Sequence, residues 1–170
     1  MINKTHEEVL RQLNLANPND RICVMGIGSD LRGDDIAGLI VADELVRRRP
    51  LELKNKLSVI YASTAPENFT GEIKKINPSY LVIVDCAELG LEAGEVKIIN
   101  EEDIGGVSFS THSLPISIII DYLKRDIDFK TIIIGIQPAD TSFGAELSNK
   151  VLKACDLVCE SIIKVCQKNA

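Results

Sequence analysis

The stretch CVMGIGSDLRGDDIAG, residues 23–38, combines an apolar run, a glycine turn and the start of a helical pattern. Gly28 and Gly33 keep the glycine spacing of a phosphate-binding P-loop. A P-loop follows its second glycine with Lys and then Ser or Thr, whereas this chain places Asp34 and Asp35 there. The loop therefore has the form of a phosphate site but carries the opposite charge, which argues against a nucleotide-binding enzyme.

Outward from this loop, predicted strands alternate with predicted amphipathic helices. The strands cover residues 21–28, 56–62, 80–87 and 130–137, with a shorter edge strand at 94–100. The helices cover residues 35–49, 66–76, 113–126 and about 145–167. Such alternation with short links predicts an α/β fold, namely a three-layer sandwich in which helices flank a twisted, mostly parallel central sheet of about five strands.

The chain has 170 residues and no internal repeat, low-complexity tract or linker-like stretch. This length is sufficient for one sizeable core, so we predict a single domain over residues 1–170. Residues 1–20 are expected to form a peripheral N-terminal helix ahead of the first strand.

Composition and charge narrow the class of partner. Lys and Arg together number 19 and Asp and Glu 25, which gives a net charge of −6 and argues against a nucleic-acid partner. No apolar run approaches the roughly 18 residues that span a bilayer, which argues against a membrane partner. The N-terminus has no signal-peptide core. We therefore expect a cytoplasmic protein. We also expect it to be a monomer.

The five cysteines include no C-x-x-C pair, and their odd number does not suit a disulfide framework. Cys155, Cys159 and Cys166 lie on an apolar stripe of the last predicted helix, and Cys23 and Cys86 lie on predicted central strands. Free cysteine in such positions behaves as a small apolar residue. We therefore predict that all five are buried and that none is a nucleophile.

Polar side chains gather where the predicted core strands end, which is where open parallel sheets bind ligands. They are Asp30, Asp34 and Asp35 after the first strand, Asp85 at the end of the third, Gln137 and Asp140 after the last, and His112 ahead of the helix at 113–126. Each of these residues also has a possible structural explanation that involves no ligand. Acids at a helix start cap N–H groups and complement the helix dipole, an Asp after a strand can bond a loop, and a histidine near a helix start can face solvent.

Two or three carboxylates together with a neutral imidazole form a site for a cation. Asp and His are suitable ligands for Zn, Ni, Fe or Co. With only three protein ligands, the coordination shell stays open for a partner to complete. The inverted charge of the first loop is thus explained if it meets a metal instead of a phosphate.

These residues resemble the maturation endopeptidases of [NiFe]-hydrogenases, most closely the subgroup that processes the formate-hydrogenlyase type (hydrogenase 3) large subunit. Five motifs carry the resemblance in chain order: GSDLRGDDIAG (28–38), TAPEN (64–68), LVIVDCAELGLEAGEVKII (81–99), THSLP (111–115) and GIQP (135–138). The chain departs from the family at Ser29, where Asn is usual, and at Ile36, where Gly is frequent.

The resemblance implies an enzyme grouped with the aspartic-type peptidases. Its substrate would be a large-subunit precursor already loaded with nickel through its own cysteine thiolates, and its product the subunit without its C-terminal extension. The nickel-contacting positions of the family fall on Asp35, Asp85 and His112. The two aspartates are also the candidate catalytic residues. Nickel would arrive with the substrate, and the isolated protein would bind it weakly or not at all.

One alternative from another class stays open on the sequence alone. The same three ligands would serve a non-catalytic nickel-recognition or chaperone module for hydrogenase assembly. Cleavage of a loaded precursor separates that module from the endopeptidase.

Overall fold

The computed structural model describes residues 7–8, 11–12, 19–109 and 114–168. Residues 7–8 and 11–12 are helical. The rest of the helix predicted over residues 1–20 lies largely outside the described residues, as does His112.

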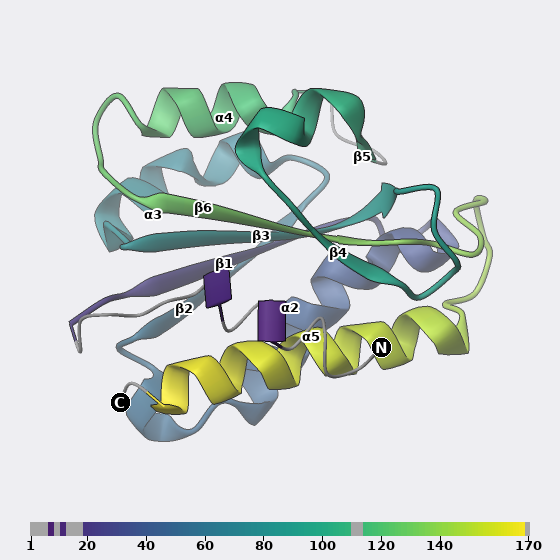
Figure 1. The fold of residues 1–170 in the computed structure, drawn as a ribbon, viewed down its shortest axis with the longest axis horizontal. Helices are drawn as coiled ribbons and strands as arrows, with labels where there is room; N and C mark the ends of the chain where they lie inside the picture. Colours follow the sequence, from purple (N-terminus) through teal and green to yellow (C-terminus); the bar gives the residue numbers. More distant parts are fainter. Residues whose placement is uncertain (1–6, 9–10, 13–18, 110–113, 169–170) are drawn as a thin grey trace.

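Strands, α-helices and short 3-10 helices (η) alternate along the chain (Figure 1). In order they are β1 (Ile22–Ile27), η1 (Gly33–Ile36), α2 (Ala37–Arg48), η2 (Leu51–Leu53), β2 (Leu57–Ser63), η3 (Pro66–Phe69), α3 (Thr70–Ile76), β3 (Tyr80–Glu88), β4 (Val96–Ile99), η4 (Glu101–Gly106), β5 (Ser108–Phe109), α4 (Ile116–Leu123), β6 (Lys130–Ile136) and α5 (Asn149–Lys168).

The sheet has the strand order β2-β1-β3-β6-β4. The pairs among β2, β1, β3 and β6 are parallel, whereas β4 runs antiparallel to β6 at one edge. The two-residue strand β5, which the sequence did not predict, pairs with β3 off this path. The predicted α/β class and mostly parallel sheet are confirmed, including the edge position of the strand predicted at 94–100.

Helices cover both faces of the sheet (Figure 1). In the view shown, α2 and α5 lie below the sheet, while α3 and α4 lie above it. Alternate residues of the central strands point to opposite faces, so that Val82 and Val84 of β3 join the core with α2 and α5. Leu81 and Ile83 join the second core, with α3 and α4. Burial on both faces explains why these strands are apolar without a break.

The predicted boundaries of two helices were wrong. α4 begins at Ile116, so Pro115 precedes the helix instead of occupying its first turn. α5 begins at Asn149 rather than near residue 145. The start of α5 is set by Ser148, whose hydroxyl accepts a hydrogen bond from Val151 N at 3.4 Å, in the manner of an N-cap.

The predicted burial of the cysteines is confirmed. All five are free, and none of their side chains is exposed. Burial raises the pKa of Cys23, Cys155 and Cys166 to about 12 and that of Cys159 to about 11. Burial also raises the pKa of Cys86, with the nearby Asp85 charge as the next cause. Thiols held in this form are poor nucleophiles, because the thiolate is the reactive species.

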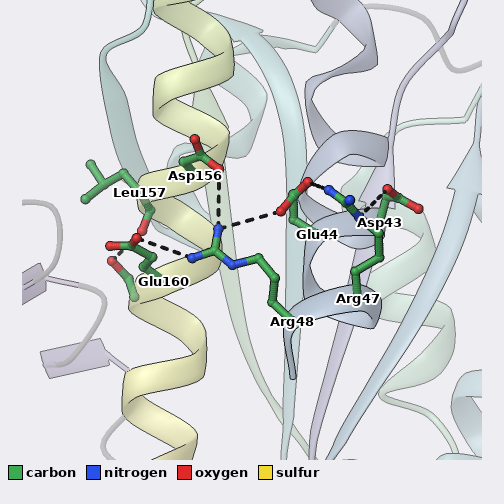
Figure 2. Close-up of polar contacts among 8 residues, drawn as sticks. Asp43, Glu44, Arg47, Arg48, Asp156, Leu157 and Glu160 are labelled. Atoms are coloured by element: carbon green, nitrogen blue, oxygen red, sulfur yellow. Dashed lines mark hydrogen bonds and ion pairs between the residues drawn. The ribbon is translucent and has the colours of Figure 1, made fainter. Parts of the chain in front are cut away.

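An ion-pair network joins the outer surfaces of α2 and α5 (Figure 2). Arg48 reaches Glu44 on its own helix at 3.6 Å, and Asp156 and Glu160 on α5 at 3.3 Å each. Beside it, Arg47 pairs with Glu44 and with Asp43. Because these groups are partly solvated, the network adds little to stability compared with the core beneath it. Within the described residues, no helix is both long and apolar enough to cross a membrane.

We predict that Ile162→Ala in the buried face of α5 lowers the free energy of unfolding by about 2–5 kcal/mol, because it leaves a cavity in the core. Arg48→Ala should cost about 1 kcal/mol or less. Urea denaturation of both variants checks this. An equal loss in the two would show that the surface network, and not the core, holds α5 in place.

Candidate active site at the carboxyl ends of β1 and β3

The connections of the sheet reverse direction between β1 and β3. From β1 the chain passes through α2 to β2 on one side, while β3 pairs with β1 on the other side. A crevice at such a switch point is where parallel sheets bind ligands. α2 starts in close contact with β1 and β3 at this point: a Cβ on Gly38 would lie 2.2 Å from the carbonyl oxygen of Ile27 and 2.3 Å from that of Val84.

Asp35 lies in η1, directly ahead of α2, and is fully buried. Its backbone oxygen accepts a hydrogen bond from Ser29 N at 3.1 Å. Gly28 is packed so closely beneath it that a Cβ there would lie 2.0 Å from the same oxygen. The Ser29 hydroxyl accepts a hydrogen bond from Leu31 N at 3.3 Å, a local bond that an Asn side chain can also make. The departure from Asn at this position therefore keeps the turn.

Asp85 lies near the end of β3 and is also fully buried. Its pKa is raised well above the ordinary value, first by burial and then by the negative charge of Asp35. A hydrogen bond from the Cys86 backbone acts in the opposite direction and lowers this pKa. Burial and the nearby negative charge both favour the protonated form of Asp85 over the ionised form. Such a pair can give or take a proton, or can exchange its proton for a cation.

Asp34, next to Asp35, has a different role. Its carboxylate accepts hydrogen bonds from Ala139 N at 2.7 Å and Asp140 N at 3.1 Å. It also accepts hydrogen bonds from the Ser148 backbone at 2.6 Å and the Ser148 hydroxyl at 3.0 Å. Asp34 thus fastens the first loop to the segment between β6 and α5. Of the three acids of the first loop, Asp30 is exposed, Asp34 is structural, and Asp35 meets Asp85.

Gln137 also proves to be structural. Its side-chain oxygen accepts a hydrogen bond from Leu89 N at 2.7 Å, and its amide donates to Glu88 at 3.0 Å. It therefore holds the chain that leaves β3. Asp140 is exposed and accepts a hydrogen bond from Ser142 N at 2.8 Å. The structure does not bring either residue into the carboxylate pair.

Comparison with known proteins gives the family. The family model for HycI, hydrogenase maturation protease, matches residues 40–165. A putative hydrogenase maturation protease of Methanocaldococcus jannaschii is 40% identical over 153 residues, covering 87% of this chain and 89% of that protein. The chain belongs to the hydrogenase maturation protease family. It is therefore a peptidase.

Further relatives agree with this assignment. The hydrogenase 3 maturation protease of Escherichia coli is 34% identical over 133 residues, covering 78% of this chain and 82% of that protein. The crystal structure of a [NiFe] hydrogenase maturation protease, HycI, from Thermococcus kodakarensis superposes with a TM-score of 0.80 at 29% identity. That match covers 91% of this chain and 97% of the other. The family resemblance read from the five motifs is confirmed.

The third residue predicted for the site, His112, lies outside the described residues. Its convergence with Asp35 and Asp85 therefore stays a prediction. Among the residues that the structure does describe, no group of three or more His, Cys, Asp or Glu side chains is arranged to hold a metal ion.

Glu67 is a further acid at this edge of the sheet, to which the sequence assigned no role. It lies in η3, which follows the carboxyl end of β2. Its Oε2 atom is buried and, within the described part of the chain, has no hydrogen-bond partner. The TAPEN motif was the available signal, but the motif alone does not say which of its residues faces inward.

We predict that the stability of the wild-type protein falls, relative to that of Asp85→Asn, as pH rises. The folded protein binds the Asp85 proton more tightly than the unfolded chain does. This contribution to stability is fully present below pH 3.8, the ordinary pKa, and is lost as pH rises through the raised pKa of the folded state. The variant has no such proton to lose. Thermal melts at about pH 5 and about pH 8 should therefore show a Tm difference, variant minus wild type, that grows with pH.

A Tm difference that is independent of pH would contradict the raised pKa. Asp30→Asn, which changes an exposed acid of the same loop, is the matched control. It should follow the wild-type dependence on pH.

Proposed function

We propose that this peptidase removes the C-terminal extension of a [NiFe]-hydrogenase large-subunit precursor that already carries nickel. Asp35, Asp85 and His112 would recognise the metal. The observation that carries the proposal is the buried pair of Asp35 and Asp85 at the switch point of the sheet. The names of the relatives, which include a hydrogenase 3 maturation protease, point to the same class of substrate.

The electrostatics of the pair suit a cation brought by the substrate. Two buried carboxyl groups cannot both ionise at low cost, because each charge raises the free energy of the other. A divalent ion held by Asp35 and Asp85 would offset this penalty and would take the place of the Asp85 proton. The precursor's thiolates would complete the coordination shell, so free nickel without them should bind only weakly.

The same carboxylates can take part in the chemistry. Cleavage adds water across the peptide bond, and a carboxylate of the pair can accept the proton of the attacking water. Nickel held nearby could polarise the scissile carbonyl or serve for recognition alone. Once the extension is removed, the large subunit can close over its metal centre. We place this reaction in the cytoplasm and assign it to a monomeric enzyme.

We expect the wild-type protein to shorten nickel-loaded precursor and to leave nickel-free precursor intact. Intact-protein mass spectrometry of the two incubations measures the outcome, and the mass lost identifies the peptide removed. Equal cleavage of both forms would instead favour a metal-independent aspartic hydrolase. Binding of the loaded precursor without any loss of mass would favour the nickel-recognition module.

We expect Asp35→Asn and Asp85→Asn to lower the cleavage rate of loaded precursor by about 100-fold or more, the typical scale for a lost acid–base group. We expect His112→Ala to lower this rate as well, because it removes a proposed nickel ligand. Each Asn variant keeps the shape of the side chain and removes its charge. Circular dichroism should show that the variants are folded. Asp30→Asn is the control and should cleave at the wild-type rate, since its carboxylate lies in solvent.

A further inference from the structure

Two large apolar side chains are exposed on the loops that follow β1 and β6. Phe143 is 76% exposed and Leu31 is 58% exposed. Among the described residues, only Leu51 and Ile118 are other large apolar side chains with more than half of their surface in solvent. Single exposed apolar residues are common and need no explanation. The significance of Leu31 and Phe143 comes from where they lie and how firmly they are held.

The loops that carry them are fastened together. The backbone oxygen of Leu31 accepts a hydrogen bond from Gly144 N at 2.8 Å, directly next to Phe143. Asp34 N donates to the Asp140 oxygen at 2.9 Å, and the Asp34 carboxylate receives the four hydrogen bonds described above. A surface held in this way loses little conformational freedom when a partner binds.

The two loops also lie on either side of β3, the strand that carries Asp85. The loop of Leu31 follows β1 and that of Phe143 follows β6, and these two strands lie on either side of β3. Their junction is therefore at the carboxyl edge of the sheet, where β3 presents Asp85. Asp35 is four residues beyond Leu31 on the same loop.

We propose that Leu31 and Phe143 form an apolar contact surface for the polypeptide of the hydrogenase precursor, next to the bond that is cut. This inference rests on the proposed function and adds specificity-determining residues to it. A protease that met only the metal would not distinguish the precursor from other nickel-bound thiolates. Burial of two exposed apolar side chains supplies affinity for the chain itself, and their fixed position sets where that chain enters the site.

The test is steady-state cleavage of nickel-loaded precursor by Leu31→Ser, Phe143→Ser and the double variant. We expect kcat/KM of the double variant to fall by about tenfold or more, mainly through a higher KM, because the lost contact is apolar burial. Leu51→Ser is the matched control. Leu51 is 76% exposed, as Phe143 is, but it precedes β2 and so lies toward the opposite edge of the sheet.

A wild-type KM in the double variant would overturn the inference, as would an equal rise in KM for Leu51→Ser. These results are distinct from failure of the proposed function, in which the wild-type protein itself leaves the loaded precursor uncut. Thermal melts separate loss of contact from loss of fold, since substitutions of exposed side chains change stability little.

A second measurement identifies the occupant directly. A photoreactive benzoylphenylalanine in place of Phe143 should crosslink to the nickel-loaded precursor, and the same group in place of Leu51 should not. Crosslinks to a second copy of this chain would assign the surface to self-association and overturn the inference. Crosslinks to the precursor from position 51 alone would also overturn it.

Discussion

The hydrogen bonds of the Asp34 carboxylate are the constraint on which the site depends. They join the first loop, which follows β1, to the start of α5, more than a hundred residues further along the chain. Hydrogen bonds to a charged group contribute about 1.5–3 kcal/mol each when they replace bonds to water. A fully buried carboxylate without them would be strongly destabilising. The loop is therefore locked in one position, and Asp35 with it.

The burial of Asp35 and Asp85, in contrast, is energetically unfavourable. Their burial beside each other raises the free energy of the ionised pair, and the raised pKa of Asp85 is the expression of that cost. Natural proteins keep such arrangements mainly at functional sites, since apolar side chains in the same place would be more stable. The neighbouring residues thus differ: Asp34 fastens the loop, whereas Asp35 adds a second buried negative charge that acts on Asp85.

Much of the fold followed from local pattern. The unbroken runs of Val, Ile and Leu in β1, β3 and β6 reflect burial on two faces, and the cysteine stripe of α5 reflects packing on one side of a helix. Helix ends were less predictable. Proline ahead of α4 and Ser148 ahead of α5 act through cap geometry, and the partner of Ser148 is distant in sequence.

The sequence by itself determined the fold class, the family and the identity of the acids that follow β1 and lie near the end of β3, because strand burial and motif residues depend on the local order of residues. Only the tertiary structure decided which acid does what. Asp34 and Asp35 are adjacent and chemically identical in the chain, yet one meets three backbone N–H groups and a hydroxyl while the other meets a second carboxyl. Those partners come from elements far apart in the sequence, and sheet order alone brings them to one edge.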